Sequence, residues 1–360
     1  MDSEGVIGLT TEIVKNVVSG IYQCSLPTGF PIGDVHVYLI TDQDGLTLVD
    51  AGAHRDDGNV KLQQAIADLG YQISDVHTII LTHGHADHVG NVNTLTKLSG
   101  ARVVGHELTQ TWLSPTDEWL QKEDQFFHRL YAESGLSEEE QMILRKERQM
   151  FHSVVPAYDL DDQLKEGEKI GDFTVLFTPG HSNSSIALYR EKDHVLIAGD
   201  VLIDHVSSNA FVEPDPLTFT RIPSVKLFHD TFHSLLDLKL NQVLSGHGIV
   251  ISDPHALIRL RLEMQTKRVA QLIDQIKEGH HSVRQLAQAL FPGRMKELML
   301  IVSEIVGHLD LAIERGLVKQ AVDDHGMIDE KIKLRCGRGF LPVAVFRQKD
   351  ARNSLFEYQV

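Results

Sequence analysis

The stretch that decides the fold is Leu81-Thr-His-Gly-His-Ala-Asp-His-Val-Gly90, which places three histidines and an aspartate within six residues. Apolar and β-branched residues precede it, so residues 76–82 predict a buried strand. Residues 89–98 have helical spacing, and the motif therefore lies on a strand-to-helix turn. Four ligand-type side chains this close together desolvate one another, and a divalent cation is the usual compensation. A solvated histidine-rich turn is the alternative, but chance rarely gives this spacing behind a strand.

Length and composition are those of an ordinary globular protein. The chain has 360 residues, which suggests about two domains, and 42% of them are apolar and 23% charged. The first residues lack the features of a signal peptide, and no apolar run reaches the length of a membrane span. Cys24 and Cys336 lie far apart and form no C-x-x-C motif. We therefore expect a cytoplasmic protein with no membrane partner, although one disulfide stays open.

Negative charge is concentrated in the first 250 residues. The formal net charge is -16; residues 1–250 hold 17 Lys and Arg against 36 Asp and Glu, and residues 251–360 hold 17 against 14. A chain this acidic has no general attraction for phosphate backbones, so nucleic acid is disfavoured as a substrate. A local basic patch in the C-terminal part would escape this argument.

Strand patterns alternate with helices through the first 250 residues. The early strands form antiparallel hairpins, which predicts a mixed α/β fold rather than a doubly wound sheet. An amphipathic helix is expected at residues 57–69. Asp50 ends a strand, where it serves either a turn or a ligand histidine, and we favour the second. The expected strands are residues 20–26, 35–40, 46–50, 76–82, 102–105, 173–177, 185–189, 194–200 and 242–248.

Further ligand-type residues stand at the ends of three later strands, which favours a site along one sheet edge. Imidazoles and carboxylates without a thiolate suit Zn²⁺, with Fe²⁺ and Mn²⁺ also plausible. Seven ligands exceed one tetrahedral zinc site and divide naturally between two metals that share a carboxylate and a hydroxide. The expected ligands are His83, His85, Asp87, His88, His181, Asp200 and His247.

The order T-H-G-H-A-D-H, P-G-H-S, A-G-D and S-G-H-G across residues 20–250 closely resembles the metallo-β-lactamase-fold hydrolase superfamily. The resemblance implies a four-layer αββα sandwich with a dinuclear site at one edge between two sheets. It further implies two metal positions and one bridging carboxylate. The first metal would be held by His83, His85 and His181, the second by Asp87, His88 and His247, and Asp200 would bridge them.

The C-terminal part predicts a small winged-helix-like α+β domain. Helices are expected at 254–277, 282–291 and 298–315, and strands at 317–322 and 342–347. This outline resembles the winged helix of the β-lactamase-like-protein-two subgroup. We therefore divide the chain into a catalytic domain, 1–251, and a second domain, 252–360. No ligand motif follows Ser252, and we expect the site chemistry to end there.

Residues 107–156 predict a helical insert of two or three helices that is rich in aromatic residues. These aromatics either pack the insert onto the body or form a lid or wall of an apolar substrate pocket. His36, His54 and His205 are further candidates for lining the pocket. We treat the remaining histidines outside the ligand set, His152 among them, as surface or core residues.

These features lead to a hypothesis of carbonyl hydrolysis. A hydroxide acidified by two cations attacks a small thioester, lactone or ester, with Asp87 and Asp200 as the catalytic carboxylates. Zinc β-lactamases of the commonest subclass have cysteine where Asp200 stands, which disfavours antibiotic hydrolysis. A phosphodiesterase or RNase, and a DNA-binding regulator acting through the C-terminal domain, are the alternatives. The expected partner is a small-molecule substrate, and a homodimer is compatible with the sequence.

Overall fold

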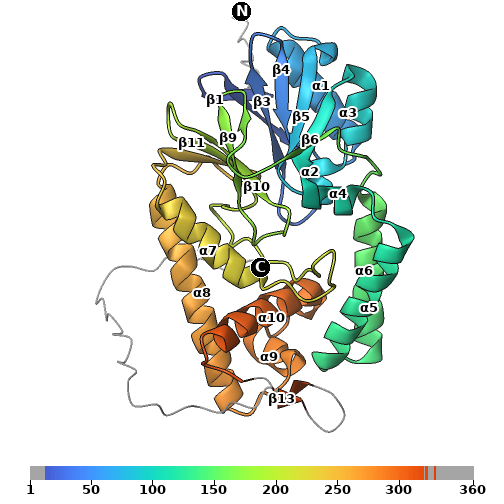
Figure 1. Cartoon of the computed structure of the whole chain (residues 1–360), viewed down its shortest axis with the longest axis vertical. Helices are drawn as coiled ribbons and strands as arrows, with labels where there is room; N and C mark the ends of the chain where they lie inside the picture. The colour runs from blue at the N-terminus through green and yellow to red at the C-terminus, as the bar shows by residue number, and fades with distance from the viewer. Residues whose placement is uncertain (1–12, 320, 323–327, 330–360) are drawn as a thin grey trace, which may run out of the picture.

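The computed structural model describes residues 13–319, 321–322 and 328–329, which form two β-sheets with helices around them (Figure 1). In the first sheet the strands follow chain order; β1 to β4 pair antiparallel, and β4 to β7 parallel. Its strands are β1 (Val14–Val18), β2 (Ile21–Leu26), β3 (Val35–Thr41), β4 (Leu46–Val49), β5 (Val76–Leu81), β6 (Arg102–His106) and β7 (Asp162–Leu164).

The second sheet has five strands in the order β12-β11-β10-β9-β8. The pair β11 and β12 is parallel and the other pairs are antiparallel, so the mixed α/β prediction is confirmed. Its strands are β8 (Lys169–Ile170), β9 (Phe173–Phe177), β10 (Ile186–Arg190), β11 (Val195–Gly199) and β12 (Gln242–Ser245).

Alternation of side chains along the strands produces four layers. On β5, Ile79 packs with the helices outside the first sheet, whereas Ile80 belongs to the core between the sheets. On β11, Ile197 faces that same inner core, and Leu196 packs with helices outside the second sheet. The expected αββα sandwich is thus confirmed. The outer helices are α1 (Asp56–Asp68), α2 (Ala86–Val89) and α3 (Val92–Ser99) on one side and α7 (Ser224–Leu236) on the other, and a 3-10 turn, η1 (Ile73–Asp75), precedes β5.

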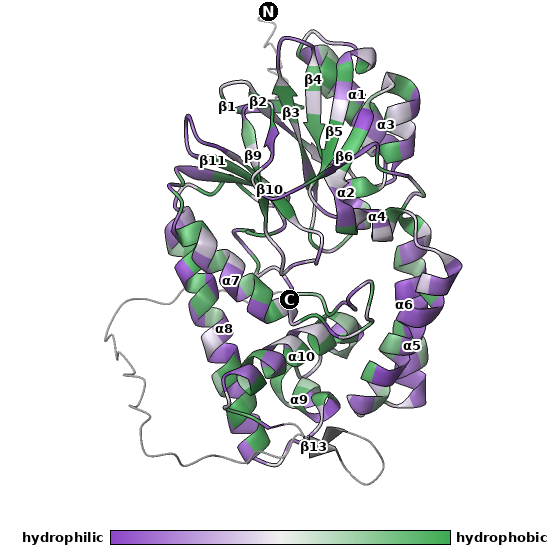
Figure 2. Ribbon diagram, viewed as in Figure 1, coloured by the Kyte–Doolittle hydropathy of each residue, from purple (hydrophilic) through white to green (hydrophobic). Residues whose placement is uncertain are grey.

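The insert contains three helices: α4 (Glu107–Leu113), α5 (Asp117–Glu133) and α6 (Glu138–Val154). Thr116 caps α5, and Ser137 with Glu140 forms a capping box that starts α6. Figure 2 shows α6 as mostly hydrophilic, in contrast to the central strands. The helices α5 and α6 pack beside each other, on the side of the molecule away from α7 (Figure 1).

The C-terminal part holds the three expected helices, α8 (Pro254–Lys277), α9 (Val283–Leu290) and α10 (Leu298–Glu314), with the 3-10 turn η2 (Met295–Glu297) before α10. These helices share one hydrophobic cluster with α7 and the second sheet. At Gly307 of α10, an added Cβ would lie 2.5 Å from Val225 of α7, so the close approach requires glycine.

The expected C-terminal strands are only partly described. A short antiparallel pair joins β13 (Ala321–Val322) to β14 (Ile328–Asp329). Residues 317–319 continue from α10 as coil, so the strand expected over 317–322 is wrong at its start. The strand expected at 342–347 and Cys336 lie outside the described residues, and the winged helix therefore stays a prediction. Within the described part of the chain, no helix is both long and apolar enough to cross a membrane.

Candidate metal centre

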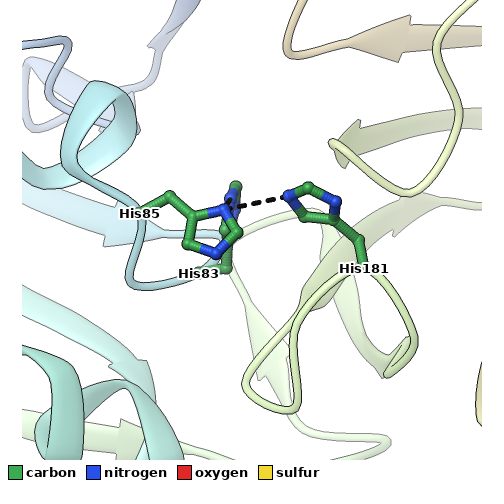
Figure 3. A group of neighbouring side chains, drawn as sticks. All are labelled: His83, His85 and His181. Atoms are coloured by element: carbon green, nitrogen blue, oxygen red, sulfur yellow. Dashed lines mark hydrogen bonds between the residues drawn. The ribbon is translucent and has the colours of Figure 1, made fainter. Parts of the chain in front are cut away.

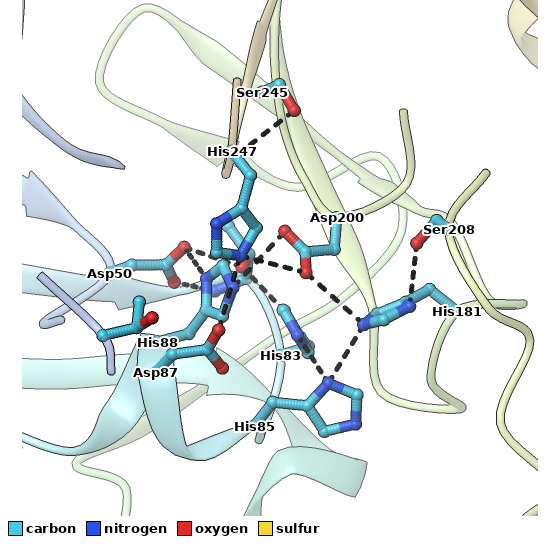
Figure 4. A network of polar contacts seen from close by, with 12 residues as sticks. Asp50, His83, His85, Asp87, His88, His181, Asp200, Ser208, Ser245 and His247 are labelled. Atoms are coloured by element: carbon cyan, nitrogen blue, oxygen red, sulfur yellow. Dashed lines mark hydrogen bonds and ion pairs between the residues drawn. The ribbon is translucent and has the colours of Figure 1, made fainter. Parts of the chain in front are cut away.

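All seven expected ligand residues lie together at one end of the two sheets (Figure 4). Four of them follow β5 at the strand-to-helix turn that the motif predicts: His83 and His85 lie on the turn, and Asp87 and His88 lie in α2. The others come from the second sheet: His181 from the loop between β9 and β10, Asp200 from the end of β11, and His247 from just beyond β12. Residues far apart in the chain are thus brought to one edge of the sandwich.

His83, His85 and His181 form one group, which Figure 3 shows from close by. His85 Nδ1 lies 3.0 Å from Nε2 of His83 and 3.0 Å from Nε2 of His181. Burial lowers the pKa of all three imidazoles, that of His85 to about 3. The rings are therefore neutral, and their lone pairs are available to a metal ion.

Asp87, His88 and His247 form the second group. His247 Nε2 lies 3.4 Å from Asp87 Oδ2. The Asp200 carboxylate stands between the groups: Oδ1 is 3.3 Å from His88 Nε2, and Oδ2 is 3.5 Å from His247 Nε2 and 3.6 Å from His181 Nε2. A carboxylate in this position is able to bind two cations at once.

The second group concentrates buried negative charge. Burial lowers the pKa of His88 and His247, but the Asp200 carboxylate and its neighbours outweigh it. The pKa of His88 is therefore well above its ordinary value, and that of His247 is about 10. The same imidazoles overcome the effect of burial on Asp87 and Asp200 and lower both carboxyl pKa values. Protons on the histidines balance charge that a divalent cation would balance instead.

Unpartnered atoms in this cluster fit a metal. His88 Nε2, His247 Nε2 and Asp200 Oδ1 are buried with no hydrogen-bond partner among the described residues. The opposite ring nitrogens are engaged: His88 Nδ1 lies 2.7 Å from Asp50, and His247 Nδ1 lies 2.8 Å from the Asp34 carbonyl. Each ring is thus oriented with its free nitrogen toward the centre, which is how ligand histidines are usually held.

Asp50 has the orienting role that its position suggested. Its backbone adopts φ 65°, at the end of β4, and its carboxylate accepts hydrogen bonds from Thr82 N at 2.8 Å and Thr82 Oγ1 at 2.9 Å. The contact to His88 completes a buried network between two neighbouring strands. Asp50 therefore contacts His88, one of the expected ligand histidines, as its position at the strand end indicated.

A cavity of about 470 Å³ opens onto the ligand cluster. Aromatic side chains of the insert form one wall: the Trp112 ring lies 5.6 Å from that of His85. Both expectations for the insert therefore hold in part: its aromatic residues line the cavity, and Phe126, Phe127 and Tyr131 also pack into the hydrophobic cluster shared with the C-terminal helices. Other insert residues that line the cavity are Trp119, Glu123, Phe127, Leu130, Tyr131, Arg148, Phe151 and His152.

Several expectations about the pocket were wrong. His36 is buried behind the centre against the Gly248 carbonyl, and the exposed His54 and His205 do not line this cavity either. His152, which we treated as unremarkable, does line it. Histidine identity alone does not tell which strand face or loop side a ring occupies.

The expectation that the site chemistry ends at Ser252 was also wrong. Met299, Leu300 and Ser303 of α10 line the cavity. The Leu300 carbonyl accepts a hydrogen bond of 3.0 Å from Asn209 Nδ2, and the Asn209 carbonyl lies 2.9 Å from His181 Nδ1. The C-terminal helix α10 therefore helps to position His181, a residue of the ligand cluster, through Asn209.

The loop between β11 and α7 supplies site residues that sequence reasoning missed. Asn209, Phe211 and Glu213 line the cavity, and the Phe211 ring lies 5.0 Å from that of His85. The segment has no metal-ligand spacing. Its only signal is an apolar run broken by Glu213 and two prolines, which does not reveal what it faces.

Comparisons with known proteins agree with this fold and cluster. A "Probable metallo-hydrolase YqjP" of Bacillus subtilis (strain 168) is 31% identical over 293 residues, which cover 79% of this chain and 90% of that protein. A "Beta-lactamase-like protein 2 homolog" of Drosophila melanogaster is 22% identical over 279 residues, which cover 74% of this chain and 76% of that protein.

Among solved structures, the metallo-beta-lactamase family protein TTHA1429 of Thermus thermophilus superposes with a TM-score of 0.72 at 27% identity, covering 85% of this chain and 97% of that one. The model of the family described as "Metallo-beta-lactamase superfamily" matches residues 31–247, the span that carries all seven clustered residues. The chain belongs to the metallo-beta-lactamase superfamily.

Proposed function

We propose that this metallo-hydrolase cleaves a small carbonyl compound, a thioester, lactone or ester, whose acyl part is apolar. The observation that carries the proposal is the ligand cluster at the end of a cavity lined by the aromatic insert. Such cavities bury most of a small ligand, and a few polar groups orient it. Two divalent cations, with Zn²⁺ favoured, would activate water and polarise the carbonyl oxygen.

The protein's own residues divide these tasks. His83, His85 and His181 would hold one cation, and Asp87, His88 and His247 the other, with Asp200 shared. Asp87 and Asp200 both line the cavity, so their carboxylates reach the space where a substrate lies. Asp87 is the group we assign to pass a proton to the leaving group.

The charges of the cavity favour a carbonyl substrate over a phosphodiester. Among the described residues that line it, Arg148 is paired with Asp124 at 3.1 Å, and Arg294 is paired with Glu297. Glu123 and Glu213 are buried acids on the same walls. A phosphate backbone would find no unpaired arginine here, and the acids would repel it.

The test is hydrolysis of a matched panel: acyl thioesters, acyl lactones, simple esters and a phosphodiester, each with and without a chelator. We expect turnover of one carbonyl class that is lost on chelation and restored by Zn²⁺, Fe²⁺ or Mn²⁺. His83→Ala should lose bound metal and activity together, at least 100-fold in kcat, because it removes a ligand. The exposed His128→Ala on α5 is the matched control and should retain both.

Two results would overturn the proposal. Turnover of the phosphodiester alone would select the alternative phosphodiesterase function. Retained carbonyl hydrolysis by metal-free His83→Ala protein would exclude the metal-dependent reaction.

A further inference from the structure

Glu213 is a buried carboxylate on the cavity wall with one oxygen unused. Its side chain belongs to a residue that is 4% exposed. Oε2 accepts a hydrogen bond of 2.6 Å from the Asn183 backbone N–H, whereas Oε1 has no partner among the described residues. Burial, with a smaller effect of Glu123, raises the pKa of Glu213 to about 8. A buried acid of this kind is costly unless a proton or a cation compensates it.

No basic side chain of residues 13–319 is paired with this carboxylate. The described basic side chains that line the cavity are paired elsewhere: Arg148 with Asp124, His152 with Glu123 at 2.9 Å, and Arg294 with Glu297. Glu213 is therefore the acid of the cavity wall that lacks a basic partner. The part of the chain that the structure describes thus leaves the compensating charge to a ligand.

Aromatic rings surround the space that such a ligand would occupy. Trp112, Trp119 and Tyr131 line the cavity with Phe127 and Phe211. The Trp119 Nε1 and the Tyr131 hydroxyl are buried without hydrogen-bond partners among the described residues. Buried polar groups normally have a partner, so these two are available to a bound ligand. Aromatic faces beside a carboxylate are the usual environment of a bound ammonium group.

Glu213 also lies close to the metal cluster along the chain. The Phe211 ring packs 5.0 Å from the His85 ring and 5.5 Å from the His181 ring. Two residues span at most about 7 Å, so Glu213 begins within that distance of Phe211. One small molecule is therefore able to reach both Glu213 and the centre.

We propose that the substrate carries a protonated amine, which the unpaired Glu213 carboxylate binds while the carbonyl group faces the metal cluster. The identity of the ligand as substrate rests on the proposed function, but amine binding does not. Glu213 is thus a residue that determines specificity, and the preferred substrates are carbonyl compounds that carry an amine in addition to the apolar acyl part, rather than neutral or acidic ones.

Intrinsic fluorescence tests this directly, because the chain has two tryptophans, Trp112 and Trp119, and both line the cavity. The probes are 4-phenylbutylamine, the neutral 4-phenylbutanol and the anionic 4-phenylbutyrate, titrated at pH 8.5 into the metal-loaded and the chelated full chain. We expect the amine to bind at least ten times more tightly than the alcohol, and the acid most weakly. Equal binding of amine and alcohol by the unmodified protein would overturn the proposal.

Glu213→Gln keeps the shape and removes the charge. It should lose the tenfold amine preference while alcohol binding stays within twofold, which also shows that the variant is folded. Glu118→Gln changes an exposed acid of α5 that is paired with Lys122 and lies outside the cavity; it is the control and should keep the preference. An unchanged preference in Glu213→Gln would contradict the assignment. Because fluorescence requires no turnover, amine binding without carbonyl hydrolysis would refute only the proposed reaction.

Discussion

At the residue scale, four of the five histidines of the cluster, His83, His88, His181 and His247, have their orientation fixed by the ring nitrogen that faces away from the centre. His181 Nδ1 lies 2.9 Å from the Asn209 carbonyl, and His83 Nδ1 lies 3.1 Å from Thr82 Oγ1. Thr82 Oγ1 donates its own proton to Asp50, so it accepts one from His83. These contacts select the tautomer that leaves Nε2 free.

Few of these supporting contacts could be predicted from the sequence. The ligands themselves were predictable because metal chemistry demands particular residue types at fixed spacing. Asp50 was predictable because it ends a strand next to the motif strand. The Asn209 and Asp34 carbonyls were not, since every residue has a carbonyl group and only the fold selects which one a histidine meets.

Glu213 gives the pH prediction. Its pKa rises from the ordinary 4.5 to about 8 in the folded chain, so above pH 4.5 the folded state binds the proton that the unfolded state has lost. The contribution of Glu213 to the free energy of unfolding therefore falls with pH between about 4.5 and 8, by at most about 1.4 kcal/mol per pH unit. Above that range this contribution is constant. Glu213→Gln removes this pH-dependent contribution, because glutamine does not titrate.

The measurement is the Tm of Glu213→Gln minus that of the unmodified protein, taken from pH 5 to pH 9 with metal present. We expect this difference to increase up to about pH 8 and then level off. Parallel Tm curves for the two proteins would show that the Glu213 carboxyl group titrates normally.

At the element scale, long segments with clear end signals were predicted best. The helix at 254–277 has the bounds of α8, because Asp253 caps it and Pro254 occupies its first turn. The strands β7 and β8, of three and two residues, are too short to show periodicity. The helix α7 is absent from the expected elements, although Val225, Phe228 and Phe232 have helical spacing and are buried.

Arg261 makes α8 a support for the site. It is 6% exposed, and its Nη2 donates hydrogen bonds of 2.8, 2.9 and 2.8 Å to the carbonyls of Ile203, Asp204 and Val206. These residues follow Asp200 in the loop that continues to Asn209. Arg261→Met would leave three buried acceptors without a donor, which should cost about 2–4 kcal/mol of unfolding free energy.

Urea unfolding with metal analysis checks this prediction. Arg261→Met should lower the midpoint and weaken metal binding, since the loop that carries Asp200 loses its support. The control, Arg259→Met, changes an exposed residue of the same helix and should shift stability by no more than about 0.5 kcal/mol. Equal midpoints for the two variants would contradict a supporting role for Arg261.

At the scale of the whole molecule, the cluster joins the two sheets at an edge where backbone hydrogen bonds also connect them. The His36 N–H donates to the Gly246 carbonyl at 2.7 Å, and the Ile186 N–H donates to the Thr82 carbonyl at 2.8 Å. The four residues of the motif follow β5 of the first sheet, whereas His181, Asp200 and His247 follow strands of the second sheet. Between the sheets lies a hydrophobic core. Metal ions at this edge would therefore act as cross-links between the two halves of the sandwich and offset the repulsion of Asp87 and Asp200.

Metal removal should thus destabilise the entire fold. Free metal at 100 to 1,000 times Kd adds about 3–4 kcal/mol to the folded state, which is roughly 3–5 °C in Tm for a chain of this length. We expect chelation to lower Tm by this amount and Zn²⁺ to restore it. His181→Ala removes the ligand that links the first group to the second sheet, so its Tm should respond less to added Zn²⁺, while exposed His128→Ala should respond fully. A Tm that is unchanged after elemental analysis has shown complete metal loss would mean that the hydrophobic core and the hydrogen bonds between the sheets hold them together without metal, and that the cluster serves chemistry without serving stability.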